Sequence, residues 1–317
     1  MTAPELDLND TAPSGAFDVR YVAFLQTLTH LRQPLHRYCS RMTGSLLDGE
    51  DVMQEALFEA YRKLDQLDDT GALRPWLFRI AHHRCLDFIR KRASRHNAEA
   101  QVEAEAEELA APADPPSVGV DRAVERLVLH LPPKERACVL LKDVLDYSLE
   151  ETAEFVGSTP GGVKAALSRG RNKLAALAAE PPAPPTPPDT AAATLLSLYV
   201  ERFNRHDWNG VRELISADAR LLVADRYSGR LADSPYFGKY EDQSFPWHLA
   251  LGEVEGEPIV LVLPAPNAEP TSAVRLDIAG GRIVHIRDYH HCPWILPAAA
   301  DVHVLPPHPI GAASWKK

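Results

Sequence analysis

The stretch that decides the fold is Leu149–Leu177, which reads LEETAEFVGSTPGGVKAALSRGRNKLAAL. Ser148 can cap a helix while Glu151, three residues later, bonds back to the capping residue, which is the capping-box pattern. Gly157 suits the left-handed conformation that follows a helix C-terminus, and Pro160 suits the first position of a new helix. The pattern therefore predicts a helix, a tight turn and a second helix.

The second helix of this stretch has one apolar face and one cationic face. At helical spacing, the inner stripe holds Val163, Leu167, Gly170 and Leu174. The outer face carries Lys164, Ser168, Arg169, Arg171, Asn172 and Lys173, and residues 159–177 include no acid. Such side chains can contact phosphates and base edges in a DNA major groove. The alternative is an ordinary helical hairpin with a solvated basic face.

Composition limits the classes to which the chain can belong. Its 317 residues are enough for more than one domain, and the net charge of -10 argues against indiscriminate coating of nucleic acid. The cysteines are far apart and indicate neither a zinc site nor a disulfide framework: Cys39, Cys85, Cys138 and Cys292. No apolar run approaches the length of a membrane span. We expect a soluble, cytoplasmic protein without membrane contacts.

From Val19 to about Arg95 apolar residues recur at helical spacing. Residues 49–61, GEDVMQEALFEAY, are strongly two-faced. The expected inner stripe holds Met53, Leu57, Ala60, Tyr61 and Leu64. The expected outer row holds Asp51, Glu55 and Glu59, which repel one another unless a cationic partner offsets that cost. A solvated helix face is an equally good interpretation of this segment alone.

A basic helix is predicted next, over residues 74–92. Its positive charges far outnumber its negative charge, which is that of Asp87. The cations are Arg74, Arg79, Arg84, Arg90, Lys91, Arg92 and, just beyond, Arg95. One side is expected to be buried, and the other offers cations and rings suited to a phosphate backbone and an unstacked base. On the other interpretation, His82 and His83 are ordinary surface histidines and Trp76 belongs to the core.

Two connectors divide the chain. Residues 97–120 carry acidic side chains, lack Lys and Arg, and end in prolines, which predicts a flexible acidic linker. Helices over 121–131 and 134–145 then lead into the helix-turn-helix and give a compact four-helix unit. The second connector, EPPAPPTPP at 180–188, is a semi-rigid proline spacer.

In this order, the motifs resemble the sigma factors of bacterial RNA polymerase, and more narrowly the extracytoplasmic-function group, which keeps the second and fourth sigma domains. The resemblance covers about residues 17–178. DGEDVMQE at 48–55 resembles the clamp-binding signature, RPWLFRIA at 74–81 the helix that opens the promoter, and LPPKER at 131–136 the entry to the fourth domain. Each motif alone is weak, and the ordered set is specific.

The resemblance implies partners and roles. The chain would bind core RNA polymerase at its clamp and flap, docking on a basic coiled coil of the largest subunit through Asp48, Asp51, Gln54 and Glu55. The downstream promoter element, with a flipped base, would be held by Trp76, Arg79, His83, Arg84, Arg90, Lys91 and Arg92. The upstream element would be read as duplex by Thr159, Lys164, Ser168, Arg169, Arg171 and Lys173. The acidic linker would thread the RNA exit path.

A further domain is predicted after the proline spacer. Helices are expected over 190–203 and 208–215, and strands over 220–225, 259–263, 271–279 and 282–290. Helices followed by a curved antiparallel sheet, with YVERFNRHDW at 199–208, resemble the SnoaL-like group of the nuclear-transport-factor-two (NTF2) superfamily, a cone with a pocket. The pocket would take a small molecule and be lined by Tyr199, Trp208, His248, His285, Arg287, Asp288 and Tyr289.

These interpretations combine into a multidomain chain with two all-α domains and a C-terminal α+β NTF2-like cone. The expected parts are a disordered N-terminus (1–18), sigma domain 2 (19–96), the acidic linker (97–120), sigma domain 4 (121–178), the proline linker (179–189), the cone (190–297) and a tail (298–317). The predicted function is that of a sigma factor regulated by its cone, with no catalytic residue, metal or cofactor. The alternatives are a free-standing helix-turn-helix regulator and a small-molecule sensor or enzyme that uses the cone.

Overall fold

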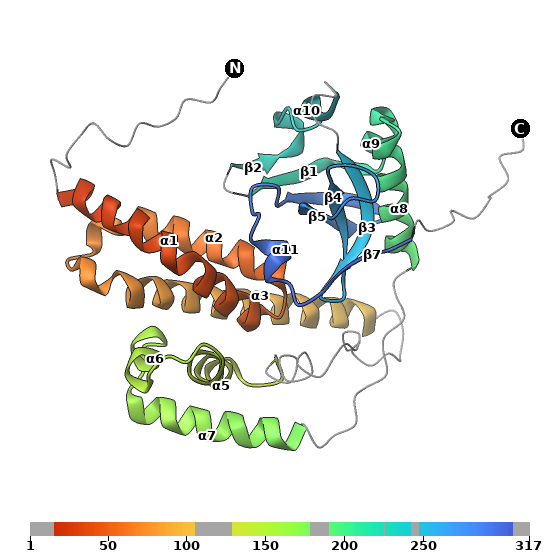
Figure 1. Ribbon diagram of the computed structural model, residues 1–317. Coiled ribbons are helices and arrows are strands. Elements are labelled where there is room, and N and C mark those ends of the chain that lie inside the picture. Colours follow the sequence, from red (N-terminus) through yellow and green to blue (C-terminus); the bar gives the residue numbers. More distant parts are fainter. Residues whose placement is uncertain (1–15, 105–128, 178–189, 225, 242–246, 307–317) are drawn as a thin grey trace, which may run out of the picture. The chain divides into compact units, whose positions relative to one another are not determined.

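The computed structural model describes residues 16–104, 129–177, 190–224, 226–241 and 247–306 (Figure 1). Residues 16–104 with 129–177 belong to one compact unit and residues 190–306 to a second, and each unit has its own hydrophobic core. The first unit is helical and the second contains a sheet, so the predicted layout of helical modules followed by an α+β domain is confirmed. The predicted proline linker lies outside the described residues, as do most of the acidic linker, the N-terminus and the tail.

The first unit begins with three helices that pack on one another: α1 (Ala16–Thr43), α2 (Leu46–Arg62) and α3 (Leu73–Ala104). Two 3-10 turns lie between α2 and α3: Leu64–Gln66 and Thr70–Ala72. Ser45 caps α2, because its hydroxyl accepts a hydrogen bond from the N–H of Asp48 at 3.3 Å. The predicted helical character of this region is thus confirmed.

The contact between α1 and α2 depends on a glycine. A Cβ atom at Gly49 would lie 2.4 Å from backbone atoms of Ser40 in α1, which is closer than side chains tolerate. A bare backbone at this position therefore lets the two helices approach closely. Met42 of α1 and Met53 of α2, neither with exposed surface, belong to the core of this unit.

Helix α3 continues to Ala104, past the boundary at residue 96 that the sequence suggested. Residues 97–104, NAEAQVEA, include Ala, Glu and Gln, which are strong helix formers. Local propensity therefore favours continuation of the helix, and an acidic composition does not by itself end it.

A second group of helices, the helix-turn-helix group, follows in the same unit: α5 (Pro133–Val139), the π-helical turn η3 (Leu140–Val144), α6 (Leu149–Phe155) and α7 (Pro160–Leu177). The N–H of Ser148 donates to the Glu151 carboxylate at 2.8 Å, and the N–H of Glu151 donates to the Ser148 hydroxyl at 3.1 Å. Gly157 has a positive φ of 63° in the turn. The predicted capping box, glycine turn and helix start at Pro160 are confirmed.

The second unit is built on a seven-stranded sheet with the strand order β2-β1-β6-β5-β4-β3-β7. Its strands are β1 (Ile215–Val223), β2 (Tyr227–Arg230), β3 (His248–Val254), β4 (Glu257–Leu263), β5 (Ser272–Ala279), β6 (Arg282–Asp288) and β7 (Val302–Val304). The expected antiparallel sheet is a mixed one, because β1 and β6 are parallel. Strands β3, β4, β5 and β6 are antiparallel, each to the next, and β6 runs in the same direction as its other neighbour, β1.

Short helices and turns accompany the sheet: α8 (Thr190–Asn204), α9 (Trp208–Glu213), η4 (Leu231–Asp233), α10 (Gly238–Glu241) and α11 (Ile295–Ala298). Helix α8 packs on β3 and β4. The side-chain amide of Asn204 donates to the carbonyl of Leu249 at 2.8 Å and accepts from its N–H at 2.8 Å. This pair of hydrogen bonds fixes the C-terminal end of α8 on the sheet.

A buried histidine links α1 to α3. The hydroxyl of Tyr38 lies 2.7 Å from Nδ1 of His82, which is only 4% exposed. Burial, together with the charges of His83 and Lys134, lowers the pKa of His82 from 6.5 to about 4. The interpretation of His82 as a surface residue is therefore wrong, whereas His83 is exposed.

The pKa of His82 predicts how stability depends on pH. Since the unfolded chain binds this proton more readily than the folded chain, stability should fall as the pH falls from about 6.5 towards 4. His82 should account for about 2 kcal/mol of lost unfolding free energy between about pH 7 and pH 5. Urea unfolding followed by circular dichroism should show this loss in the wild type and not in His82→Gln. His83→Gln is the control and should keep the wild-type slope; equal slopes in all three proteins would contradict the assignment.

Candidate nucleic-acid and partner interfaces

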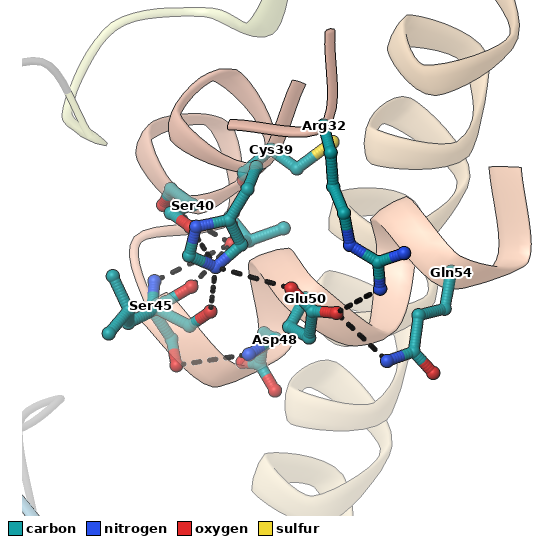
Figure 2. Close-up of polar contacts among 10 residues, drawn as sticks. Arg32, Cys39, Ser40, Ser45, Asp48, Glu50 and Gln54 are labelled. Atoms are coloured by element: carbon teal, nitrogen blue, oxygen red, sulfur yellow. Dashed lines mark hydrogen bonds and ion pairs between the residues drawn. The ribbon is translucent and has the colours of Figure 1, made fainter. Parts of the chain in front are cut away.

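Near the N-terminal end of α2 lies a buried carboxylate, that of Glu50, which sequence reasoning did not single out. Glu50 has no exposed surface. Its carboxylate lies 3.4 Å from Nη2 of Arg32 and 3.7 Å from Nε2 of His36, and the amide of Gln54 donates to it at 2.9 Å (Figure 2). Such partners are needed because burial strongly disfavours an unpaired charge. Gln54, predicted to contact the polymerase, thus directs its amide nitrogen towards Glu50.

The other predicted polymerase contacts on α2 differ in exposure. Asp48 is buried, and its carboxylate lies 3.7 Å from the guanidinium of Arg92 in α3. Asp51 is half-buried and Glu55 is exposed. Of these acids, Glu55 therefore presents its carboxylate most directly to a partner.

Glu59, expected at the end of an exposed acidic row, lies between two cations. Nζ of Lys63 and Nε of Arg84 are each 2.6 Å from its carboxylate. The hydrogen bonds from Lys63 and Arg84 hold the pKa of this carboxyl below its ordinary value. The expectation of an exposed acidic row is therefore wrong for Glu59, because a cation from α3 and one from α2's own C-terminal cap neutralise it.

Sequence reasoning missed two exposed aromatic rings on α2. The Phe58 side chain is 63% exposed, and the guanidinium of Arg62 lies 5.3 Å from its ring centroid. Tyr61, expected on the inner stripe, is 45% exposed, so that expectation is wrong. Helical spacing could have found Phe58, since it follows Asp51 by seven residues and lies on the same face. We call Asp51, Glu55, Phe58 and Arg62 the α2 stripe.

The predicted downstream-element residues lie along α3, but their charges are not equally available. Arg84 and Arg92 pair with carboxylates of α2, and Arg90 lies 3.2 Å from Asp87. The guanidinium of Arg79 donates to the carbonyl of Glu154 in α6 at 3.2 Å. The remaining predicted residues are the exposed Lys91 and His83 and the half-buried Trp76, whose ring packs against the core. Lys91 forms no ion pair with another described residue.

Helix α7 presents the predicted upstream-element residues. Val163, Leu167 and Gly170 are buried and Leu174 packs against the core, which confirms the predicted inner stripe. Lys164, Ser168, Arg169, Arg171 and Lys173 are exposed, as the periodicity predicted. The Thr159 hydroxyl accepts a hydrogen bond from the N–H of Gly162 at 3.1 Å and so caps the helix.

Two arginines of α7 are partly neutralised from within the unit. Arg169 lies 2.7 Å from Glu135 of α5. Arg171 makes two hydrogen bonds to Asp143, at 3.0 and 2.6 Å, which raise the pKa of its guanidinium. Lys164 and Lys173 make no ion pair with the part of the chain that the structure describes. The two lysines are therefore the cations of α7 most available to an external anion.

In the second unit, the predicted pocket residues lie on two faces of the sheet. Asp288 is buried and accepts hydrogen bonds from the hydroxyl of Tyr236 at 3.0 Å, the hydroxyl of Tyr240 at 3.4 Å and the N–H of His290 at 2.9 Å. Tyr199 is also on this inner side, where burial and then the Asp288 charge raise the pKa of its hydroxyl. Tyr289, just beyond the end of β6, is buried as well.

Aromatic rings occupy much of the inner side. Trp208 packs edge-on against Phe203 at a centroid distance of 5.2 Å, and Tyr240 packs against Trp247 at 4.9 Å. His248 is half-buried at the start of β3. An open hollow of about 370 Å³, lined by Ser216, Leu231, Phe237 and neighbours, includes none of the predicted pocket residues.

His285 and Arg287 lie on the other face, around Asp277. Asp277 is 3.5 Å from Nδ1 of His285, 2.8 Å from Arg287 and 3.5 Å from Arg275. Burial and the neighbouring arginines lower the pKa of His285. His285 and Asp288, both predicted to line the pocket, therefore do not lie together, because alternation along β6 directs them to opposite faces.

The described residues contain no group of three or more His, Cys, Asp or Glu side chains placed to hold a metal ion. Among them, too, no helix combines the length and apolar character that crossing a membrane requires.

Comparison with known proteins identifies both helical groups. Residues 27–95 match the family model for Sigma-70 region 2, and residues 121–174 match that for Sigma-70 region 4. ECF RNA polymerase sigma factor SigG of Mycobacterium tuberculosis (strain H37Rv) is 33% identical over 213 residues, which are 59% of this chain. The chain spans 58% of the length of SigG. SigW of Bacillus subtilis is 31% identical over 163 residues, covering 48% of this chain and 87% of SigW.

Solved structures give further likenesses. The sigma factor RpoE in complex with the anti-sigma factor NepR, from Bartonella quintana, is 25% identical, with 49% of this chain and 96% of that chain covered and a TM-score of 0.39. The Mycobacterium tuberculosis extracytoplasmic function sigma factor SigJ is 20% identical, with 83% and 95% covered and a TM-score of 0.34. The match to region 2 falls on the first helical group and the match to region 4 on the second. SigW is matched over most of its length. The chain belongs to the family of ECF RNA polymerase sigma factors.

Proposed function

We propose that this protein binds core RNA polymerase and directs it to a set of promoters, where α3 holds the melted downstream element and α7 reads the upstream element as duplex. The observation that carries the proposal is the exposed face of α7. Lys164, Ser168 and Lys173 project from it, and the whole helix carries no acid. A helix of this kind offers charge to phosphates and short polar groups to base edges. A protein with this role acts in the cytoplasm, where the polymerase and the chromosome are.

The α2 stripe is the proposed surface for the polymerase. Glu55 and Asp51 offer negative charge to a basic coiled coil, and Phe58 offers an apolar ring beside them. Interfaces draw most of their binding energy from a few aromatic or arginine anchors surrounded by polar contacts. Phe58 and Arg62 have this character, and Glu55 supplies the charge that orients the encounter.

The proposed downstream contact uses the part of α3 that internal pairing leaves available. Lys91 and His83 are exposed, and Arg90 is 72% exposed in its side chain although it pairs with Asp87. Exposed pairs of this type are weak and exchange readily for a phosphate. Trp76 packs on the core and is half-buried rather than fully buried, which suits stacking by a base flipped out of the duplex.

The proposed role of the second unit is regulatory rather than enzymatic. Asp288, its buried carboxylate, already accepts three hydrogen bonds, and aromatic side chains fill the space around it. A general base needs a free lone pair facing a substrate. These contacts therefore favour a protein-binding or restraining module over a catalytic cone.

The α2 stripe yields the first test of this function. Phe58→Ala should weaken binding of the full chain to purified core RNA polymerase by roughly fivefold or more, because an anchor ring contributes above about 1 kcal/mol. Asp51→Arg combined with Glu55→Arg should abolish promoter-directed transcription by repelling the basic coil. Asp68→Arg, at an exposed acid outside the stripe, is the control and should behave as wild type. Full activity of the double variant would sink the proposal and favour a free-standing DNA-binding regulator.

The α7 lysines yield a second test. Binding of the holoenzyme to promoter DNA should weaken steeply with salt, and Lys164→Ala or Lys173→Ala should each reduce the slope of log K against log salt by about one. Arg171→Ala should reduce it less, because Asp143 already neutralises that guanidinium. A wild-type holoenzyme whose promoter affinity does not change with salt would count against these contacts.

The regulatory role of the second unit yields a third test. The first unit has a separate core, so deletion of residues 178–317 should leave a folded protein. We expect its promoter-directed transcription with core polymerase to differ from that of the full chain by at least about threefold, since a restraint worth about 0.7 kcal/mol changes an equilibrium by that factor. Circular dichroism checks the fold, and identical transcription by the two proteins would remove the regulatory proposal.

A further inference from the structure

The exposed face of α7 has a centre and two flanks. The centre lies opposite the buried Val163 and Gly170 at helical spacing, and within residues 164–173 it consists of Ala165, Ser168, Arg169 and Asn172. The cations on its flanks are Lys164 and Arg171 on one side and Lys173 on the other. When a helix of this kind enters a major groove, its centre meets the base edges and its flanks meet the phosphate backbones.

Arg169 is the charged residue of this centre, and a carboxylate of another helix holds it. Nε of Arg169 donates a hydrogen bond to Glu135 of α5 at 2.7 Å. The Glu135 side chain is 13% exposed, whereas the Arg169 side chain is 59% exposed. The guanidinium is therefore held on its inner side. Its N–H groups on Nη1 and Nη2 make no hydrogen bond with another residue that the structure describes, so they are available to a ligand.

A glycine brings the two helices close enough for this contact. A Cβ atom at Gly170 would lie 3.0 Å from Cγ2 of Val139 and 3.6 Å from Cβ of Glu135. A bare backbone at this position therefore lets α7 pack closely on α5, directly beside Arg169. Because Val139 and Gly170 are buried, the packing of these two helices fixes where the Glu135 carboxylate lies relative to the guanidinium.

The pairing with Glu135 changes what Arg169 can recognise. A phosphate is attracted by charge, and the adjacent carboxylate cancels much of the charge of Arg169. A base edge is recognised through hydrogen bonds, and the paired guanidinium keeps the fork formed by Nη1 and Nη2. Guanine offers two acceptors in the major groove, O6 and N7, which an arginine fork contacts together. Arg169 is thus better suited to a guanine than to a phosphate.

We propose that Glu135 is a positioning residue for promoter recognition, which holds the guanidinium of Arg169 so that Nη1 and Nη2 read a guanine of the upstream element. This inference rests on the proposed function. Glu135 acts through Arg169 and not by touching DNA. Holding the guanidinium in place lowers the cost of ordering it on binding. Cancelling its charge weakens attraction to the phosphates of other sequences, so both effects raise the ratio of specific to non-specific affinity.

The test uses variants of the full chain, each bound to core polymerase, and a library of DNA duplexes of random sequence. Sequencing the duplexes that each holoenzyme retains gives its base preference at every position. Arg169→Lys keeps the charge and removes the fork. Glu135→Ala removes the carboxylate, whereas Glu135→Gln keeps an oxygen that accepts the Nε–H. The matched control is Glu150→Ala, at an exposed acid of α6 in the same helix-turn-helix group. Circular dichroism verifies that each variant is folded.

The wild type should prefer guanine at a position of the upstream element by about five- to 150-fold, and Arg169→Lys should lose that preference. Glu135→Ala should lose about two- to tenfold of it although Arg169 is intact. Its binding to non-cognate DNA should also become tighter and more dependent on salt, by up to about one in the slope of log K against log salt. Glu135→Gln should restore most of the guanine preference, and Glu150→Ala should match the wild type.

A wild-type guanine preference in Arg169→Lys or in Glu135→Ala would overturn the inference. A Glu135→Gln variant with no more preference than Glu135→Ala would also overturn it, because the accepting oxygen would then not be what positions Arg169. Absence of any binding to core polymerase would instead overturn the proposed function. The same selection with the free chains would still reveal whether Glu135 controls the base preference of Arg169.

Discussion

A charge that this fold takes out of water has to find its counter-charge, or a row of carbonyls, inside the fold. Glu50 does so with Arg32, His36 and Gln54, and Arg136 does so with backbone oxygens of α1 and its own group. Carboxylates near the surface also pair with arginines of α3 and α7, so part of the positive charge of these two helices is neutralised within the fold. What remains for a nucleic acid or a polymerase is therefore a subset of the cations and acids that the sequence displays.

Periodicity was enough to predict the buried face of α7, but it misplaced Tyr61 on α2 and could not predict the ion pairs between helices. The inner stripe of α7, with Val163 and Leu167, follows from helical spacing because one face must pack on the core. The pairing of Arg84 with Glu59 joins residues of different helices, so it depends on how α2 and α3 pack rather than on either segment. His82 was misjudged for the same reason, since its partner Tyr38 comes from α1.

The second unit was less predictable. Helix α8 and strands β4, β5 and β6 were expected near their observed positions, because apolar runs and turn residues mark them. Strands β2, β3 and β7 were missed. Strands β2 and β7 are short, mostly exposed and at the edges of the sheet, and β3 has a glycine, Gly252, within its apolar run, so little apolar patterning marks them. On β6, alternation places Arg287 and Asp288 on opposite faces of the sheet, so the predicted pocket residues of this strand do not gather on one side of it.

Gly49 has a consequence for any attempt to map the polymerase-binding surface by random substitution. It is a buried residue of α2 that faces the backbone of Ser40 in α1. A larger residue there would push α1 and α2 apart and tilt Glu55 and Phe58 away from their positions. A mutational scan would thus score position 49 as a recognition determinant, although its contribution is the spacing between two helices and not any contact beyond the protein.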